Sequence, residues 1–180
     1  DSLWALVLTR ICQGFGAGKW GRPSRVFRFV AARFLPLAPF RQPSTKSGRK
    51  YCRLAEGDRV VWVELVRDAT SLFVATQQAR VTHFAIEEIP VLSGAGKGVR
   101  GIKLSDAKDG VLGAAQMARP SDCLRVKTSH DKVLVFGQMK YEVSARGGKG
   151  IRAAQRSTFT EILRPDIVLV DWATIEQGEK

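Results

Sequence analysis

The chain has 180 residues, an apolar fraction of 44% and a formal net charge of +12. This composition is that of a globular chain and excludes a disordered one, and the length suffices for one core or a row of small cores. No apolar run reaches 18 residues, which excludes a membrane-spanning helix. The three cysteines are far apart and form no metal-binding pattern, which favours reduced thiols over zinc or a disulfide framework. Because Asp1 opens a strand-like run, we expect a fragment or a trimmed product.

Nearly all the excess charge lies in the first third of the chain. Residues 2–55 hold eleven Lys or Arg and no acid, whereas residues 56–180 hold eighteen basic and sixteen acidic residues. A field of one sign attracts polyanions, first nucleic acid and second an anionic membrane. The alternative is a basic loop that only keeps the protein soluble.

The first third reads as strands broken by loops. Residues 26–40 fit either a short strand followed by a loop or a short basic amphipathic helix. The other expected segments are a strand at 2–9, a glycine-rich loop at 12–21, a basic loop at 42–50, and paired strands at 51–54 and 59–66.

The rest of the chain predicts short strands and little helix. A hairpin is expected at 71–76 and 80–84, followed by a turn at 85–90 and a small-residue loop at 91–98. The remaining strands are expected at 99–104, 110–115, 123–128, 132–136, 152–163 and 167–172, with a polar tail at 173–180.

Two glycine-rich loops carry the clearest chemical signal. One is Arg146-Gly147-Gly148-Lys149-Gly150-Ile151-Arg152, and a shorter form is Gly96-Lys97-Gly98-Val99-Arg100. Glycines allow backbone N–H groups and a cation to approach a phosphate closely. Such contacts hold a DNA backbone without reading bases. The alternative is a tight turn that needs positive φ, with its lysine merely solvated.

These loops belong to a repeat. Thr76 and Thr128, each closing an apolar run, are 52 residues apart, and so are Gly98 and Gly150. A fainter copy is formed by residues 6–9 and 46–50. An aspartate precedes an apolar strand in each unit, at Asp58, Asp109 and Asp166, and we interpret these aspartates as turn formers. A period near 50 with several short strands per unit is typical of propeller blades.

The order of motifs resembles the C-terminal β-pinwheel of the A subunit of DNA gyrase and topoisomerase IV. Residues 146–150 match five of the seven residues of the gyrase box, Gln-Arg-Arg-Gly-Gly-Lys-Gly, and Ser144 and Ala145 stand where the box has Gln and Arg. The resemblance implies an all-β, propeller-like fold of about three four-stranded antiparallel blades in an open arc or partial disc. It favours a strand followed by a loop within 26–40.

We therefore expect one domain over residues 1–180. Its expected parts are blade 1 at about 2–66 with an insertion at about 10–45, blade 2 at about 71–116, blade 3 at about 122–172, and a tail at 173–180.

The resemblance also implies a function. The chain would bind and wrap duplex DNA without sequence specificity and present a segment to the cleavage core of a type IIA topoisomerase. Its implied partners are the A-subunit core and the B subunit, in a bacterial, nucleoid-associated, cytoplasmic setting. Chiral wrapping of the gyrase kind and a topoisomerase IV role in decatenation both stay open. The expected DNA-binding residues are Arg146, Gly147, Gly148, Lys149, Gly150, Arg152, Lys97, Arg100, Lys46, Arg49, Lys50 and Arg53.

No catalytic residue, metal site or cofactor is expected in this chain, and ATP and Mg²⁺ would belong to other parts of the full enzyme. Tyr51 and Tyr141 lie outside the family's cleavage motif, and His83 and His130 are isolated, each interpreted as a surface or hairpin residue. The segment Gly16–Gly21 fits Gly-x-Gly-x-x-Gly but lacks the acid and crossover helix of a dinucleotide site.

Two other classes of function stay open. One is a propeller-like protein-interaction scaffold whose basic rim is incidental. The other is a peripheral membrane binder that uses residues 26–40, although no membrane partner is expected.

Overall fold

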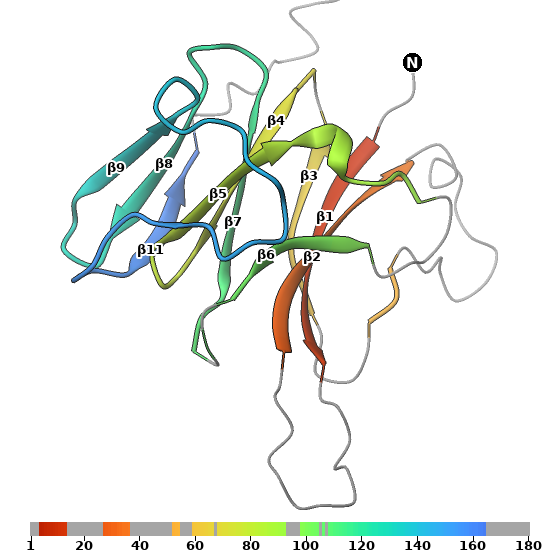
Figure 1. Cartoon of the computed structure of the whole chain (residues 1–180), viewed down its shortest axis with the longest axis horizontal. Coiled ribbons are helices and arrows are strands. Elements are labelled where there is room, and N and C mark those ends of the chain that lie inside the picture. Colours follow the sequence, from red (N-terminus) through yellow and green to blue (C-terminus); the bar gives the residue numbers. More distant parts are fainter. Residues whose placement is uncertain are drawn as a thin grey trace, which may run out of the picture.

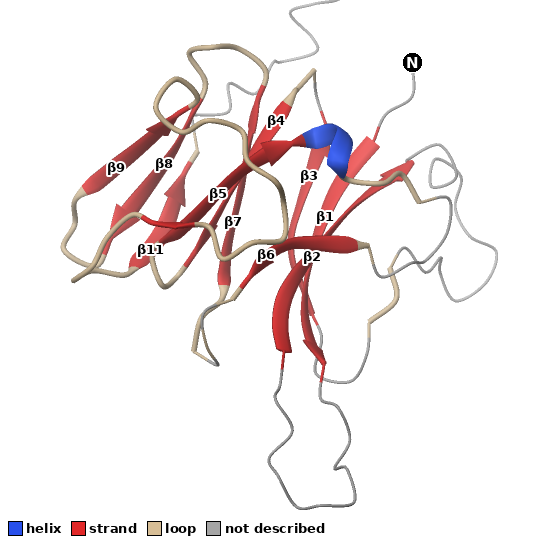
Figure 2. Cartoon of the chain, in the orientation of Figure 1, coloured by secondary structure: helices blue, strands red, loops and turns tan. Residues whose placement is uncertain are grey.

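In the computed structural model, three antiparallel sheets stand side by side (Figures 1 and 2). The structure describes residues 4–13, 27–36, 52–54, 59–66, 68–92, 98–104, 106 and 108–164, and in the first two of these ranges only Ala32 and Phe34 have described side chains. The strands are β1 (Trp4–Gln13), β2 (Phe27–Pro36), β3 (Arg59–Val66), β4 (Ser71–Thr76), β5 (Arg80–Ala85), β6 (Val99–Lys103), β7 (Val111–Met117), β8 (Cys123–Thr128), β9 (Val133–Gly137), β10 (Ile151–Arg152) and β11 (Phe159–Leu163). Over the described ranges, helix is limited to the 3-10 turn η2 (Ile86–Glu88). The all-β, propeller-like prediction is confirmed.

Each sheet is a blade built on one hairpin. The first blade has the strand order β3-β1-β2-β6, the second β10-β5-β4-β7, and the third β11-β8-β9. The hairpins β1–β2, β4–β5 and β8–β9 are therefore equivalent, and so are β3, β7 and β11, which pair with the first strand of each hairpin.

The threonines found as repeat anchors occupy one structural position. Thr9, Thr76 and Thr128 each lie beside a register shift, where the strand pairs with β3, β7 or β11. The next turn is also repeated, because the residue three positions after the later two threonines has positive φ, 55° at Ala79 and 58° at Asp131. The 52-residue period is thus a repeat of backbone geometry, and the predicted hairpin of 71–76 with 80–84 is confirmed.

The glycine loops do not complete their own blades. The sequence interpretation gave residues 99–104 to the second blade, but β6 pairs with β2 of the first blade. In the same way, β10 pairs with β5 of the second blade. This part of the interpretation is wrong, because strand pairing across units leaves no local signal in a sequence read one unit at a time.

Two further strand assignments need correction. Residues 52–54 form no strand, and β3 pairs with β1 instead of with that segment. In the third blade, the place of β7 is taken by β11, which starts at Phe159. The strand predicted at 167–172 lies outside the described residues, as do Asp58 and Asp166.

Burial follows the alternation of side chains across each sheet. On one face of the second blade, Leu72, Val74 and Phe84 pack against the first blade with Ala32 and Phe34. The opposite face packs against the third blade through a second cluster of buried residues: Phe73, Ala75, Val81, Met117, Leu124, Val126, Phe136 and Phe159. Full burial of one such aliphatic or aromatic side chain contributes about 1.5 to 3 kcal/mol. The second blade is therefore fixed from both sides.

The buried position of Ala32 and Phe34 also bears on residues 26–40. Most of this stretch is strand β2, and both described side chains belong to the core shared by the first two blades. This agrees with the strand interpretation and not with an amphipathic helix lying on a membrane.

Candidate nucleic-acid interface

The two glycine-rich loops belong to segments that cross from one blade to its neighbour. We call residues 98–103 the upstream crossover and residues 141–152 the downstream crossover. The upstream crossover ends in β6 on the first blade, and the downstream crossover ends in β10 on the second.

The crossovers dock in the same register. Val99 pairs with Ala32 and the next residue pairs with Ala31. Likewise Ile151 pairs with Val81, and the next residue pairs with Arg80. In each case the aliphatic residue lies opposite a core position of the blade, and an arginine follows it.

The fold requires glycine to different degrees at the three glycine positions of the downstream crossover. Gly150 has φ +67°, and a Cβ there would lie 2.6 Å from the carbonyl oxygen of Val81. Gly147 has φ +84°, and a Cβ there would lie 3.4 Å from the carbonyl oxygen of Arg100. At Gly148, a Cβ would meet only the backbone nitrogen of Gly150, at 4.0 Å. The fold therefore requires glycine at 150 and favours it at 147, but it does not require glycine at 148.

Arg146 holds the loop in place. Its Nε donates to the carbonyl oxygen of Glu88 at 2.9 Å, and a terminal guanidinium nitrogen donates to the carbonyl of Arg100 at 3.2 Å. The Glu88 carboxylate lies 3.8 Å from the same Nε. Because the guanidinium is engaged on two sides and half-buried, Arg146 positions the loop more than it offers charge to a ligand.

The two crossovers also touch each other. The N–H of Gly147 donates to the carbonyl of Gly101 at 2.7 Å, and the N–H of Lys103 donates to the carbonyl of Gly148 at 2.8 Å. Two motifs that are distant in sequence thus form one continuous surface.

This surface is strongly basic. The described parts of the two crossovers, extended to residue 156, hold six basic residues and one acid, Glu142. Four of the basic side chains are exposed: Arg100, Lys149, Arg152 and Arg156. Arg152 also donates to the carbonyls of Ala154 and Gln155 at 3.3 and 3.1 Å, which holds its guanidinium beside the loop. We call these four side chains the cationic track.

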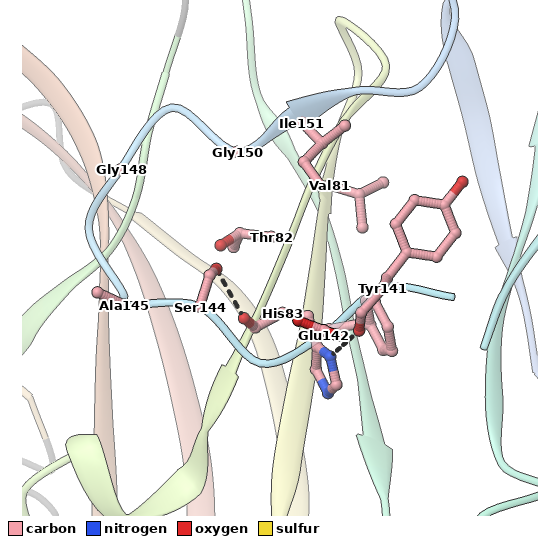
Figure 3. Close-up of a pocket in the computed structure, with 11 residues that line it drawn as sticks. Val81, Thr82, His83, Tyr141, Glu142, Ser144, Ala145, Gly148, Gly150 and Ile151 are labelled. Atoms are coloured by element: carbon pink, nitrogen blue, oxygen red, sulfur yellow. Dashed lines mark hydrogen bonds between the residues drawn. The ribbon is translucent and has the colours of Figure 1, made fainter. Parts of the chain in front are cut away.

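A small cavity of about 200 Å³ lies beneath the downstream crossover (Figure 3). On its floor, His83 stacks on Phe73 with ring centroids 3.9 Å apart. The imidazole Nδ1 donates to the carbonyl of Tyr141 at 2.6 Å, and Nε2 lies 2.8 Å from the Ser71 hydroxyl. His83 is therefore a buried residue of the β4–β5 hairpin that ties the crossover to β5, so the interpretation as a surface or hairpin residue holds for the hairpin and not for the surface.

Tyr141 and Asp109 both have structural roles. The Tyr141 ring packs against Phe136 at a centroid distance of 5.1 Å. Asp109 is buried, and its carboxylate accepts from the N–H of Gln78 at 3.0 Å. The turn-forming interpretation of Asp109 is confirmed, since this bond joins the start of β7 to the hairpin turn.

The structure brings together six of the predicted DNA-binding residues from the downstream crossover with Arg100 from the upstream one. Lys97, Lys46, Arg49 and Lys50 lie outside the described residues. Arg53 is exposed, and no hydrogen bond or ion pair joins it to either crossover in the described part of the chain. The sequence interpretation missed Arg80, whose guanidinium donates to the carbonyl of Gly150 at 3.3 Å, and Arg156. A partner 70 residues away leaves no local pattern.

The described ranges contain no cluster of three or more His, Cys, Asp or Glu residues able to hold a metal ion. They also contain no helix with the length and apolar character needed to cross a bilayer.

The blades and their crossovers define a β-propeller-type domain of the pinwheel kind. The family model described as the DNA gyrase C-terminal domain, a β-propeller, matches residues 35–67 and 70–116. The chain thus resembles the C-terminal domain of the DNA gyrase and topoisomerase IV A subunits, as the repeated motifs predicted.

Solved structures support the same fold. The C-terminal domain of a DNA topoisomerase IV has a TM-score of 0.66 at 16% identity, over 89% of this chain and 46% of that one. A DNA gyrase A C-terminal domain has a TM-score of 0.63 at 13% identity, over 92% and 50%. The E. coli ParC C-terminal domain has a TM-score of 0.55 at 15% identity, over 90% and 79%. The chain spans about half the length of the first two. No curated protein sequence matches it.

Proposed function

We propose that this chain binds duplex DNA along the cationic track, without reading base sequence, and bends or wraps it. The resemblance to gyrase A and topoisomerase IV C-terminal domains supports this function. By the same resemblance, the chain would act within a topoisomerase A subunit and present the bound DNA to the cleavage core. Its further partners would then be the A-subunit core and the B subunit, in the bacterial cytoplasm.

One observation carries the proposal most directly. Gly148 and Lys149 lie at the exposed tip of the downstream crossover, and the fold does not need a glycine at 148. A missing side chain at an exposed tip beside a lysine suits the close approach of a phosphate backbone. The fixed Arg146 would hold this tip in a single position.

The positive charge of the cationic track suits a ligand that is bound through its phosphate backbone. Exposed lysine and arginine side chains displace counterions from DNA, so binding should weaken steeply with salt. The hydrogen bonds between the crossovers keep Arg100 and Lys149 on one surface, which a duplex could follow from one blade to the next. Bending along such a surface would not depend on base sequence.

The test combines a salt titration with a measurement of DNA topology. The protein is bound to nicked circular plasmid, the nick is ligated, the protein is removed and the topoisomers are resolved. Salt-sensitive binding with a shift in linking number would support wrapping of a defined hand. Salt-sensitive binding without a shift would support bending without chiral wrapping, as in a decatenation role.

The outcome that contradicts the proposal is weak, salt-insensitive binding to duplex DNA. It would favour the interaction-scaffold interpretation, in which the basic rim is incidental. A matched pair of variants locates the path: Lys149→Ala lies in the cationic track, and Lys132→Ala lies at the β8–β9 turn.

A further inference from the structure

The cavity beneath the downstream crossover exists because the loop is held away from the strand that it follows. The N–H of Ser144 donates to the carbonyl of His83 on β5 at 2.8 Å, and Ile151 pairs with Val81 further along the same strand. Between these two points, two backbone hydrogen bonds join the loop to the upstream crossover instead. The loop therefore arches away from β5 and leaves a space of about 200 Å³ beneath it (Figure 3).

Side-chain contacts on both sides keep this arch in one position. The guanidinium of Arg146 bonds to two backbone carbonyls at 2.9 and 3.2 Å. On the other side, Arg80 donates to the carbonyl of Gly150 at 3.3 Å. The cavity is thus preformed, and a ligand that enters it does not have to order the loop, which favours affinity.

One buried polar group in the cavity wall has no partner. Thr82 lies in β5 with only 4% of its surface exposed, and it lines the cavity. In Figure 3 it is framed by the arch from Ser144 to Gly150, and no residue of the described part of the chain forms a hydrogen bond with its hydroxyl. A buried hydroxyl without a partner is destabilising, because it has lost its hydrogen bonds to water. A ligand with a hydrogen-bonding group would supply the missing bond.

The space is too large for a single water molecule. A water occupies about 30 Å³, so one water at Thr82 would satisfy the hydroxyl and leave most of the volume empty. An engineered apolar cavity of about 150 Å³ binds benzene. The cavity beneath the crossover therefore has room for one six-membered ring with a small substituent.

The other walls are apolar and aromatic. Phe73 and Val81 are buried, and Ile151 lines the cavity from the side of the crossover. The ring of Tyr141 stands edge-on to that of Phe73, with centroids 6.5 Å apart. Aromatic walls favour an aromatic ligand, since rings attract one another through their edges and faces in addition to the area that they bury.

The charges around the cavity favour an uncharged ligand. Of the described residues that line it, none is a lysine or arginine, so an anion would have no cationic partner. The carboxylate of Glu142 is exposed, and an ion pair in solvent contributes little. The neighbouring cationic track would in addition repel a positively charged ligand.

We propose that this cavity binds one small, uncharged aromatic molecule of the phenol type, whose hydroxyl pairs with Thr82. The ring occupies the apolar space beneath the downstream crossover, and the hydroxyl supplies the hydrogen bond that Thr82 lacks. An apolar pocket with one or two well-placed polar groups is the usual form of a small-molecule site. The proposal does not depend on DNA binding.

The test is a titration of the full chain with phenol, followed by NMR of the backbone amides. We expect saturable shifts at Thr82, Ser144 and Gly148, which line the cavity. Benzoate and benzylamine carry opposite charges on the same ring. Both should bind at least about tenfold more weakly than phenol, because burial of an unpaired charge is unfavourable.

The Thr82→Val variant separates the hydrogen bond from the apolar fit. It replaces an unpartnered hydroxyl by a methyl group of similar size, so the fold should be kept. Phenol binding should weaken about tenfold, the usual contribution of one hydrogen bond, whereas toluene binding should not weaken. The matched control is Thr160→Val on β11, whose hydroxyl bonds to the carbonyl of Lys127 outside the cavity, and it should leave the binding of both probes unchanged.

Three outcomes would overturn the proposal. One is a titration in which the shifts do not saturate or lie away from the cavity, since phenol would then bind only non-specifically. Another is equal phenol binding by the Thr82→Val variant, since the hydroxyl of Thr82 would then not be the partner. The last is tighter binding of benzylamine than of phenol, since the site would then be a cation site at Glu142.

Discussion

The N–H of Gly147 donates a 2.7 Å hydrogen bond to the carbonyl oxygen of Gly101. This bond joins the two glycine-rich segments that the sequence presents as separate motifs. Because Gly101 lies in β6 on the first blade and Gly147 leads into β10 on the second, the bond also links the outer edges of neighbouring blades. Changes in either loop should therefore affect both stability and binding, to degrees that the local geometry predicts.

The first prediction separates two nearby glycines. Gly150→Ala should lower the free energy of unfolding by about 2 to 3 kcal/mol, since a left-handed conformation and a backbone collision both oppose a Cβ. Gly148→Ala should change it by no more than about 0.5 kcal/mol, because the space beside Gly148 is open. Urea unfolding of both variants measures the difference. Equal costs would show that the loop differs from the geometry described.

The second prediction concerns the exposed cations. Replacing Lys149 and Arg152 by alanine should weaken duplex binding and reduce the slope of log affinity against log salt by about 1 for each phosphate that is no longer neutralised. Stability should change little, because both side chains are exposed. The Lys132→Ala variant is the charge-matched control. An unchanged slope in the double variant would place the DNA elsewhere.

The third prediction concerns the role of Arg146 in holding the downstream crossover in position. Arg146→Ala should lower both stability, by about 1 to 2 kcal/mol, and DNA affinity, because it releases the carbonyls of Glu88 and Arg100. Arg146→Lys should restore little, since one ammonium cannot reproduce the planar fork. The comparison with Lys149→Ala, which should affect binding alone, needs thermal unfolding and a binding titration. A loss of affinity without any loss of stability would instead make Arg146 a direct DNA contact.

The fourth prediction tests the contact between the first two blades. A Cβ at Gly113 would lie 2.4 Å from the Trp62 ring, so Gly113→Ala should destabilise the protein by more than about 2 kcal/mol. Trp62→Leu should also be destabilising, because the ring packs against the core cluster between the two blades. The double variant should be less destabilised than the sum, and a double-mutant cycle measures that coupling. Strict additivity would contradict the contact.

The fifth prediction is a pH dependence at the turn before β8. The Asp122 carboxylate accepts from the N–H groups of Arg119 and Ala118 at 2.8 and 2.9 Å, and these bonds, chiefly the one from Arg119, lower its pKa below the ordinary value of 3.8. A lowered folded-state pKa stabilises the fold above the unfolded value, and the contribution is lost as pH falls through the folded value.

Asp122→Ala should therefore cost about 1 kcal/mol at pH 7 and progressively less below pH 4. Unfolding curves at several pH values measure this, with Ser121→Ala as the control on the same exposed turn. A difference that stays constant down to pH 2 would indicate that the charged form of Asp122 is not the stabilising one.

Much of the fold could be predicted because each hairpin is built from residues that are close together in the sequence. A hairpin needs only alternating side chains and a turn, so the hairpin formed by residues 71–76 and 80–84 could be predicted from the sequence. The repeat marked by Thr76 and Thr128 could be predicted in the same way. The same period predicted that Gly98 and Gly150 are equivalent, and their following residues dock in the same register. The class of fold was therefore predictable from periodicity and motif order.

The sequence by itself determined the all-β class, the hairpins, the repeat and the family that the chain resembles, because each depends on residues close together or at a fixed period. Only the tertiary structure decided which blade each crossover closes, since a strand edge pairs through backbone groups common to all residues. It also showed that Arg146 is a fixed positioning residue, that His83 is buried and that Gly148 is not required by the fold. Those roles depend on residues that are dozens of positions away in the sequence and come into contact only when a strand from one unit pairs with the blade of another.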